Sequence, residues 1–302
     1  MNTNILRLLD GHLAKTEVDP LGTLGVFHCF QHQQIRRVPI QQASMVLVFR
    51  GEKRILLSAA SHSIATGELV MLPAGSDVSL ENLPCPQQHE YLALSVGFSN
   101  FTVQGFLDRF GSQIDWQQQA PQLKQTIPQA LYDALEYRLV QRLQGRKPSP
   151  IMYEVQQQEL LAICSEFGLL GFLAPTNHGD WKQRVAAIVG LDLAYEWRIA
   201  DLCRRLAVSE SVLRRHLQEE GTSYREILEQ ARLVTALALL QETPITIAQV
   251  AAQVGYQSQS RFTERFKQRF GITPSQLKAS RKKAGNPALL AEIGELLAEK
   301  QY

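Results

Sequence analysis

The sequence predicts an α+β protein in which an N-terminal β-barrel is followed by a helical segment and then by an all-α domain. Three observations support this order: short strand-forming runs broken by glycine and proline up to about residue 98, apolar residues at helical spacing from about residue 101, and a duplicated helix-turn-helix pattern near the C-terminus. The 302 residues are enough for two domains, each with a sizeable core.

The overall composition is that of a folded globular protein. Hydrophobic residues make up 45% of the chain, and no apolar run reaches the roughly 18 residues of a membrane span. The first twenty residues contain Asp10, Glu17 and Asp19 and lack the apolar core of a signal peptide, so we expect a cytoplasmic protein with no membrane partner. The four cysteines are scattered without a Cys-x-x-Cys pair, which argues against a zinc site or a disulfide framework.

Charge is distributed unevenly along the chain. Residues 1–180 contain 13 lysines and arginines against 16 aspartates and glutamates, a net charge of −3. Residues 181–302 contain 18 against 13, a net charge of +5, and residues 198–283 alone contain 15 against 8. This asymmetry is typical of an acidic sensing domain joined to a domain that binds a polyanion.

The N-terminal strands are predicted from short apolar runs separated by turn residues. Gly51 lies between the runs Ser44–Arg50 and Lys53–Leu57, which are expected to form a hairpin. Short strands at regular spacing favour a small β-barrel or jelly roll. The five runs are Ser44–Arg50, Lys53–Leu57, Glu68–Leu72, Asp77–Glu81 and Tyr91–Phe98.

The next segment has apolar residues at helical spacing. Helices are expected over Ala130–Leu143 and Met152–Glu166, with the breaker GRKPSP at residues 145–150 between them. Leucines recur every four residues at Leu131, Leu135, Leu139 and Leu143, a stripe that fits a core or a dimer seam better than a cofactor site. Gly168–Gly179, which contains glycine, proline and asparagine, is the best linker candidate.

The C-terminal region contains an internal duplication. Residues 198–208 (RIADLCRRLAV) and 246–256 (TIAQVAAQVGY) share the pattern polar-Ile-Ala-polar-apolar, with a further apolar residue four positions on. Each copy is followed by a serine, Ser209 or Ser258, and then by a second amphipathic segment. Equivalent residues of the two copies are 48 positions apart before Gln257. They are 49 positions apart after it, because Gln257 is an extra residue in the second turn. Duplicated patterns usually mean copied structural units.

Each copy has the signals of a helix, a tight turn and a second helix. Thr246 and Gln249 form a capping-box pattern, and Gly255 can adopt the left-handed conformation that ends the first helix. Ser209 and Ser258 are expected to cap the second helices. Alanines at three positions are expected to let the paired helices approach closely: Ala200, Ala248 and Ala251.

The second helix of each copy has one apolar and one polar face. Val212, Leu213 and Leu217 form the apolar face of the first, and phenylalanines spaced by four form that of the second: Phe262, Phe266 and Phe270. One such pattern also fits an ordinary helical bundle with solvated polar faces. Two copies at matching internal spacing favour a pair of DNA-binding helix-turn-helix units.

The outward side chains of these helices suit the major groove of DNA. Arginine can grip guanine through two hydrogen bonds, glutamine can grip adenine, and glutamate can accept from a cytosine amino group. Arg265, Lys267 and Arg269 supply cations for phosphates. The predicted DNA-binding residues are Ser211, Arg214, Arg215, Gln218, Gln259, Ser260, Thr263, Glu264, Arg265 and Lys267.

With these motifs, Trp197–Lys278 resembles the DNA-binding domain of the AraC/XylS family of transcription regulators. The most specific stretch is Ala248–Lys278, with its Gly-aromatic turn, its serine-containing recognition helix ending in Phe-Lys-x-x-Phe-Gly, and its closing Thr-Pro segment. Leu277 stands where the family usually has an aromatic residue, and Glu264 where a basic or amide residue is common.

The resemblance implies that Ser223–Gln241 is a long helix joining the two units, and that both recognition helices enter successive major-groove turns on one face of the DNA. By position in the motif it places seven residues at base-facing sites: Ser211, Arg214, Arg215, Gln259, Ser260, Thr263 and Glu264.

Residues of about 20–98 resemble, more loosely, the cupin-like effector domain of one group of these regulators. The resemblance implies that residues 105–170 form helices that can dimerise. Metal-binding cupins use a His-x-His pair, which this chain lacks. Its histidines at His28, His32, His62 and His89 fit surface or hydrogen-bonded roles better than a metal site.

The sequence therefore predicts residues 1–104 as a cupin-like effector-sensing β-barrel, 105–180 as a helical dimerisation segment and linker, and 181–302 as a double helix-turn-helix domain. The expected function is a transcription regulator, an activator rather than an enzyme, with no catalytic residues, metal or cofactor. Its expected partners are double-stranded DNA, a small-molecule effector, RNA polymerase and a second copy of the chain. The alternatives are a cupin-type metal-dependent enzyme fused to a DNA-binding domain, and an architectural DNA-binding protein whose barrel only dimerises.

Overall fold

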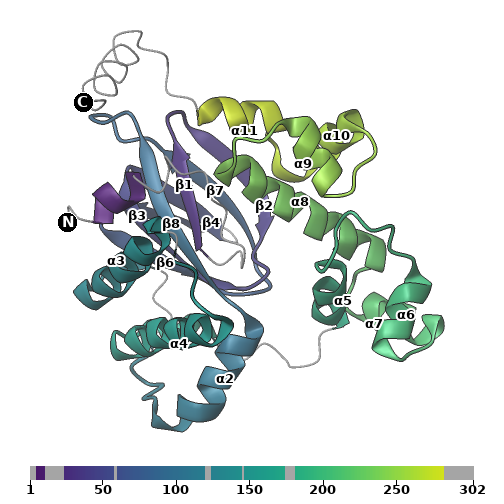
Figure 1. Ribbon diagram of the computed structural model, residues 1–302, viewed down its shortest axis with the longest axis horizontal. Coiled ribbons are helices and arrows are strands. Elements are labelled where there is room, and N and C mark those ends of the chain that lie inside the picture. The colour runs from purple at the N-terminus through teal and green to yellow at the C-terminus, as the bar shows by residue number, and fades with distance from the viewer. Residues whose placement is uncertain are drawn as a thin grey trace.

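The computed structural model describes residues 5–10, 24–57, 60–119, 124–144, 146–173 and 181–281. Its N-terminal part is built on two antiparallel sheets, with strand orders β1-β8-β3-β6-β9 and β2-β7-β4-β5 (Figure 1). The α+β class is confirmed, and the predicted barrel takes the form of two stacked sheets. The strands are β1 (Leu24–Cys29), β2 (Gln33–Pro39), β3 (Ala43–Arg50), β4 (Glu52–Leu57), β5 (Ala60–Ala65), β6 (Glu68–Leu72), β7 (Asp77–Leu83), β8 (Tyr91–Phe98) and β9 (Lys124–Thr126).

Gly51 carries the chain from one sheet to the other. β3 pairs with β6 and β8, whereas β4 pairs with β5 and β7, so the predicted hairpin between these two runs is wrong. Gly51 has a φ of +80°, and a Cβ atom there would lie 2.4 Å from the carbonyl oxygen of Leu83. A glycine between two short strands has the same sequence signature in a hairpin and in a crossing between stacked sheets.

The five-stranded sheet is covered on both faces. Met45, Leu47 and Phe49 of β3 pack against helices, while Val46 and Val48 of the same strand face the other sheet. This explains why β3 and β8 are almost continuously apolar instead of alternating. The covering helices are a short one at residues 5–10, α2 (Asn100–Phe110), α3 (Gln129–Leu143) and α4 (Pro150–Glu166), with single turns η1 (Gly111–Gln113) and η2 (Leu170–Leu173).

The leucine stripe of α3 belongs to this helix-covered core. Leu131, Leu135 and Leu139 are each 0% exposed in the single chain, so they are core residues and not a dimer seam. The side chain of Leu143 lies outside the described part of the structure. The predicted boundary between residues 104 and 105 falls inside α2, and residues 174–180 of the predicted linker lie outside the described ranges.

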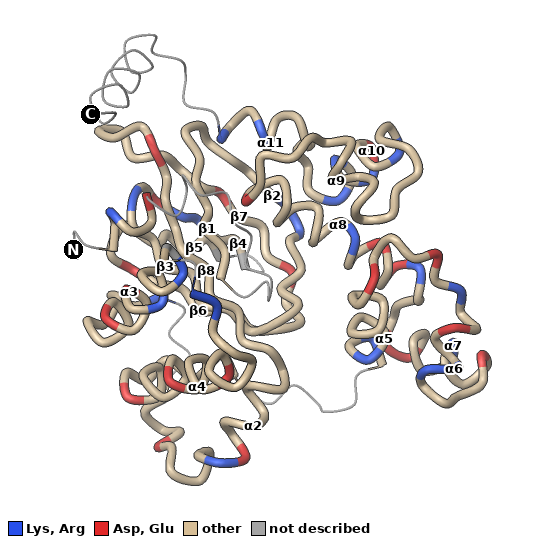
Figure 2. The backbone as a smooth tube through the Cα atoms, viewed as in Figure 1, with Lys and Arg blue, Asp and Glu red and all other residues tan. Residues whose placement is uncertain are grey.

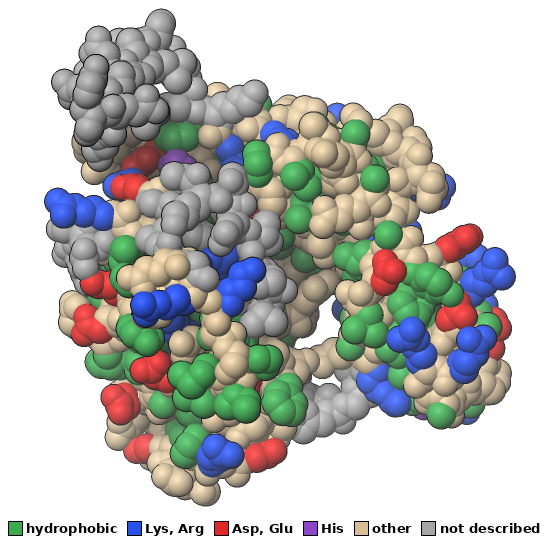
Figure 3. Space-filling model, viewed as in Figure 1, with side chains coloured by type: hydrophobic (Ala, Val, Ile, Leu, Met, Phe, Trp, Pro, Cys, Tyr) green, Lys and Arg blue, Asp and Glu red, His purple; other side chains and the backbone are tan. Residues whose placement is uncertain are grey.

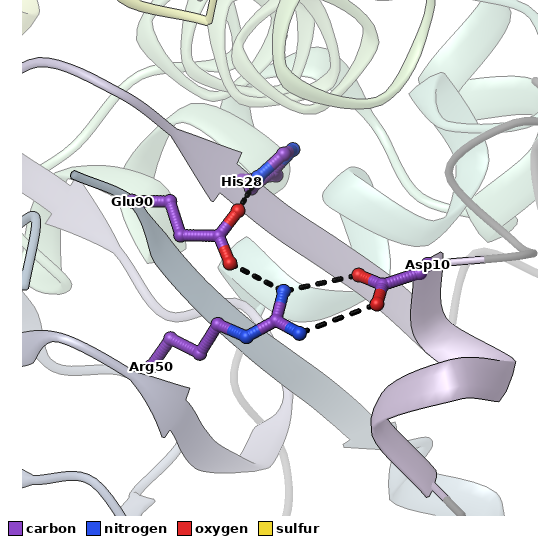
Figure 4. A network of polar contacts seen from close by, with 4 residues as sticks. All are labelled: Asp10, His28, Arg50 and Glu90. Atoms are coloured by element: carbon purple, nitrogen blue, oxygen red, sulfur yellow. Dashed lines mark hydrogen bonds and ion pairs between the residues drawn. The ribbon is translucent and has the colours of Figure 1, made fainter. Parts of the chain in front are cut away.

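A polar network ties the helix at residues 5–10 to the five-stranded sheet (Figure 4). The Arg50 guanidinium donates to both Asp10 carboxylate oxygens, at 3.0 and 3.2 Å, and also pairs with Glu90. The other oxygen of Glu90 lies 3.2 Å from Nε2 of His28. Burial is the largest influence on His28 and lowers its pKa below the ordinary value of 6.5, although the Glu90 carboxylate opposes the shift.

The C-terminal domain is entirely helical in its described residues. Seven helices follow one another: α5 (Trp181–Val189), α6 (Ile199–Leu206), α7 (Glu210–Glu219), α8 (Tyr224–Glu242), α9 (Ile247–Gln253), α10 (Gln259–Phe270) and α11 (Pro274–Ser280). The long α8 begins at its cap Ser223 and joins the two repeated units, as the family resemblance implied (Figure 1). No helix among the described residues is long and apolar enough to cross a membrane.

The second repeated unit docks on β2, the edge strand of the four-stranded sheet. Ile35 of β2 is buried in one cluster with Leu240, Phe270 and Leu277 of the C-terminal domain. At the end of α11, the carbonyl oxygen of Ser280 accepts hydrogen bonds from the backbone N–H groups of residues 30 and 31, at 2.8 and 3.2 Å. The unit is therefore fixed to the sandwich by both apolar and backbone contacts.

Candidate nucleic-acid interface

The first repeated unit consists of α6, a tight turn and α7. Ala207 forms the turn with φ 55° and ψ 43°, a left-handed conformation that is unusual for a residue with a Cβ atom. Ser209 then caps α7, its hydroxyl accepting from the N–H of Val212 at 3.3 Å. Leu213 and Leu217 are buried, in a cluster with Leu202 of α6. Packing against α6 thus leaves the other side of α7 in solvent.

The second unit repeats this construction with α9 and α10. Thr246 and Gln249 form the predicted capping box, and Gly255 takes the left-handed conformation with φ +81°. The hydroxyl of Ser258 accepts from the N–H of Arg261 and caps α10. Gly255 and Ala207 occupy equivalent positions in the duplicated pattern, and both have a positive φ.

The apolar face of α10 is a row of three phenylalanines whose neighbouring rings meet at tilted or edge-to-face angles. Phe262, Phe266 and Phe270 are each 0% exposed, with ring centroids 5.6 and 4.7 Å apart along the row. This confirms the burial predicted from their spacing. The prediction for the alanines is only partly right, because Ala251 is buried whereas Ala200 and Ala248 are exposed at the first turns of their helices.

The predicted DNA-binding residues lie on the solvent sides of α7 and α10. On α7 all four are exposed, and on α10 four are exposed and two are half-buried. The exposed residues are Ser211, Arg214, Arg215, Gln218, Gln259, Ser260, Glu264 and Lys267, and the half-buried ones are Thr263 and Arg265. The structure thus gathers them into two polar faces, one on each recognition helix.

Several of these side chains already have partners within the domain. Arg214 pairs with Glu210 one turn earlier at 2.6 Å, and Arg215 lies 3.8 Å from Glu219 one turn later. Both arginines are well over half exposed, at 59% and 65%, so these ion pairs are weak and exchangeable. Arg265 lies 3.4 Å from Glu229 of α8 and turns toward the helix that supports it.

Other cations of the basic region serve the fold. Arg269, predicted as a phosphate contact, pairs with Asp77 of the sandwich at 3.2 Å. Arg232 donates to the carbonyl oxygens of residues 193 and 195, and Arg281 donates to those of residues 240 and 243. Charge counting cannot separate such carbonyl-binding cations from those that face solvent.

The docked sandwich contacts the C-terminal end of α10. Arg37 donates to the carbonyl oxygen of Gln268 at 3.0 Å, and the side chain of Arg36 lies against Gly271. The N-terminal turns of α10, with Gln259, Ser260 and Glu264, stay exposed. Lysine and arginine positions occur along α6, α7 and α10, with acidic positions among them (Figure 2).

Two histidines of the sandwich have carboxylate neighbours. His28 contacts Glu90, and Nε2 of His32 lies 3.4 Å from Glu81. Among the described residues, no group of three or more histidine, cysteine, aspartate and glutamate side chains is placed to hold a metal ion.

Comparison with known protein families gives two matches. A model described as the AraC-type transcriptional regulator N-terminus matches residues 20–163, and a helix-turn-helix domain model matches residues 202–280. The first covers the sandwich, α2, α3 and most of α4, and the second begins in α6 and ends at the last residue of α11.

Curated relatives align with about a third of the chain or a little more, and the chain covers about two fifths of each relative's own length. The chain is 35% identical over 108 residues to the HTH-type transcriptional regulator GadX of Escherichia coli O6:H1, covering 36% of this chain and 38% of that protein. It is 29% identical over 101 residues to the TCP pilus virulence regulatory protein of Vibrio cholerae, covering 33% and 37%. It is 27% identical over 118 residues to the urease operon transcriptional activator of Escherichia coli, covering 39% and 40%.

Among solved structures, ToxT of Vibrio cholerae has a similar fold over most of both chains. Its apo K231A variant superposes with a TM-score of 0.58 at 17% identity, covering 86% of this chain and 97% of that one. The wild-type ToxT structure with a bound unsaturated fatty acid gives 0.57 at 18% identity, covering 85% and 94%. At this identity the likeness establishes the fold alone.

Proposed function

The chain belongs to the AraC family of transcriptional regulators, and from this premise we propose that it binds specific DNA sites through α7 and α10 and regulates transcription in response to a small-molecule effector. The observation that carries the proposal is the pair of exposed polar faces on two helices, each resting on its own buried apolar core. A helix of this kind presents side chains to base edges while its unit stays rigid.

Each residue has a proposed role on the DNA. Arg214 and Arg215 of α7 are proposed to reach guanines, and Gln259 of α10 to reach adenine. Ser211, Gln218, Ser260, Thr263 and Glu264 complete the two base-facing sets, and Lys267 contacts phosphate. Arg265 is already held by Glu229 and would reach phosphate only by exchanging that partner.

Activation is the proposed direction of regulation, with RNA polymerase as the protein partner. One relative is by its name the transcriptional activator of the urease operon. The effector is proposed to bind the N-terminal sandwich. ToxT, whose fold this chain shares, has been solved with an unsaturated fatty acid bound, which supports an effector of small size.

Dimerisation is proposed through α2 and α4. These helices leave large apolar side chains in solvent: Phe101 is 80% exposed, Ile151 77% and Val155 55%. Hydrophobic side chains gather over this region of the molecule (Figure 3). Contiguous exposed apolar residues are typical of an interaction site. The proposed domain division is 1–104, 105–180 and 181–302, and the helix α2, at residues 100–110, spans the first of these boundaries.

The proposed function is tested by selecting bound sequences from random DNA with the full chain. We expect an enriched motif with two half-sites about one helical turn, roughly 10 base pairs, apart. Affinity for the selected site should fall on the order of a thousandfold between about 50 and 200 mM salt, because phosphate contacts release counterions. A chain carrying Arg214→Ala and Arg215→Ala is the control. Failure of the wild-type chain to enrich any sequence contradicts the proposal.

A further inference from the structure

The two repeated units have separate cores that share the helix α8. Ile227 and Ala231 of this helix are buried with the first unit, whereas Leu233 and Leu240 are buried with the second. Arg232 therefore lies at the changeover from one core to the other. Figure 1 shows α5, α6 and α7 at one end of α8 and α9, α10 and α11 at the other. Bending of α8 at this point would move α10 relative to α7 with little change inside either core.

The side chain of Arg232 connects α8 to the α5–α6 loop, residues 190–198. Its Nε donates to the carbonyl oxygen of Leu193 at 2.9 Å, and its Nη2 donates to that of Tyr195 at 3.2 Å. A guanidinium is a planar fork that can hold two acceptors at once in a fixed geometry. Arg232 thus fastens the loop of the first unit to the middle of the shared helix.

The α5–α6 loop also touches the turn of the second unit. A Cβ atom on Gly255 would lie 2.5 Å from the carbonyl oxygen of Leu193 and 2.7 Å from Nη2 of Arg232. Close contact, in addition to its left-handed φ, therefore requires a glycine here. The side chain of Leu193 packs against both cores. The loop is thus a second connection between the units, beside α8 itself.

Hydrogen bonds within the α5–α6 loop make this connection stiff. The Asp192 carboxylate accepts from the N–H groups of residues 194 and 195, both at 3.0 Å. The carbonyl oxygen of Asp192 accepts from the indole N–H of Trp197 at 2.8 Å. Trp197 is buried in the core of the first unit. A displacement of Leu193 is therefore passed on to that unit, because the loop has little freedom to absorb it.

We propose that Arg232 is a specificity-determining residue that fixes the spacing of the two DNA half-sites by holding the α5–α6 loop between the units. This inference rests on the proposed function. One base pair inserted between the half-sites moves one of them by about 3.4 Å and turns it by about 34°. Two units held in one geometry cannot follow this change, so the DNA has to deform at a cost in free energy. Arg232 acts in this way without touching the DNA.

The experiment compares the affinity of the full chain for three duplexes: the selected site, and the same site with one base pair added or removed between its half-sites. We expect wild type to prefer the selected spacing by at least about tenfold. Arg232→Ala should reduce this ratio to about threefold or less, because α8 alone then joins the units. The wild-type ratio in Arg232→Ala overturns the proposal, as does a wild-type chain that binds all three duplexes equally.

Arg281→Ala is the matched control. Arg281 also donates to two carbonyl oxygens, those of residues 240 and 243, but all three residues belong to the second unit. This variant should keep the wild-type ratio even if both affinities fall. A duplex with a single half-site gives a further comparison, and Arg232→Ala should bind it as tightly as wild type does. Loss of that binding would show that Arg232 supports one unit and not the spacing of the two.

A second variant covers the case in which Arg232→Ala does not fold. Asp192→Ala removes an exposed carboxylate, so it should fold, and it loosens the α5–α6 loop while Arg232 stays in place. It should lower the spacing ratio in the same direction, and an unchanged ratio then overturns the proposal. Failure of the wild-type chain to select any sequence contradicts the proposed function. A selected site whose spacing preference survives both substitutions contradicts only the role of Arg232.

Discussion

Gln33 and Ser280 are 247 positions apart in the sequence and are joined by a buried hydrogen bond of 2.7 Å. Gln33 is on the edge strand β2 of the sandwich, and Ser280 is the last residue of α11. The Ser280 hydroxyl in turn donates to the carbonyl oxygen of Leu277 at 2.7 Å. One serine hydroxyl therefore accepts from the N-terminal domain and donates within the C-terminal domain.

Replacing Ser280 by alanine should lower the free energy of unfolding by about 1–3 kcal/mol, because the Gln33 amide is left buried without its acceptor. Urea unfolding of the full chain measures the loss. Ser61→Ala, at an exposed serine of β5, is the control and should stay within about 0.5 kcal/mol of wild type. A Ser280→Ala chain as stable as the control would show that this bond contributes nothing to the docking of the domains.

Arg215→Ala should weaken binding to the selected DNA site by about 1–3 kcal/mol and relax the base preference at one position. The physical reason is the loss of a two-pronged contact to guanine from an arginine that is free to reorient. Fluorescence anisotropy with specific and random duplexes measures both effects. Arg225→Ala, at an exposed arginine in the first turn of α8, should leave the ratio of the two affinities unchanged. Equal losses on both duplexes from Arg215→Ala would make it a phosphate contact.

Phe266→Ala should cost on the order of 3–5 kcal/mol of stability, since it removes the central ring of the buried row on α10. Thermal and urea unfolding give the value. The control substitution Leu191→Ala removes a large apolar side chain that is 72% exposed beyond the end of α5 and should change stability by less than about 0.5 kcal/mol. If both variants unfold at the same urea concentration, the core of the second unit is not where the structure places it.

Ala207→Gly should stabilise the protein by about 0.5–1 kcal/mol. The left-handed conformation costs an alanine about 1–2 kcal/mol, and the greater freedom of glycine in the unfolded chain cancels part of the gain. Ala252→Gly, at an exposed position inside α9, should instead destabilise by about 1 kcal/mol. The two glycine substitutions are therefore expected to change the free energy of unfolding in opposite directions. A loss at position 207 would contradict the turn geometry of the first unit.

Stability should depend on the protonation of His28. Because its pKa is lowered in the folded state, the folded protein binds this proton less tightly than the unfolded chain does. The stabilisation is complete above the ordinary pKa of 6.5 and is lost as the pH falls through that value toward the folded pKa. Between about pH 7.5 and 5.5, a His28→Gln chain should therefore lose less stability than wild type. The same loss in both proteins would exclude His28 as the titrating group.

The sequence was most informative where the pattern is local. Caps, the left-handed turn at Gly255 and the phenylalanine row follow from short-range rules, and all appear in the structure. The polar faces of α7 and α10 could then be predicted as well, because the residues opposite the buried face of a helix lie in solvent. Family resemblance added the long α8 and the relation between the two units.

Features that depend on distant parts of the chain were not predictable. The crossing at Gly51 depends on which strands pair with β3 and β4, and the stretch of sequence around it is compatible with either outcome. The ion pair of Arg269 with Asp77 joins residues 192 positions apart, so short-range rules give no sign of it. Nothing in the sequence indicated that Lys53 is buried, because a lysine in a short strand usually lies on the solvent face.

The shape of β2 has a consequence for biosynthesis. This edge strand is synthesised long before α10 and α11, the helices that cover it, so a growing chain exposes it until residues 259–280 have been made. Its register shifts between Ile35 and Val38, Arg37 adopts a left-handed φ of 49°, and Pro39 ends it without an N–H to donate. Bulges, charges and proline are the means by which edge strands avoid pairing with strands of other molecules. The irregular backbone that receives α10 in the finished protein thus also guards the nascent chain against aggregation.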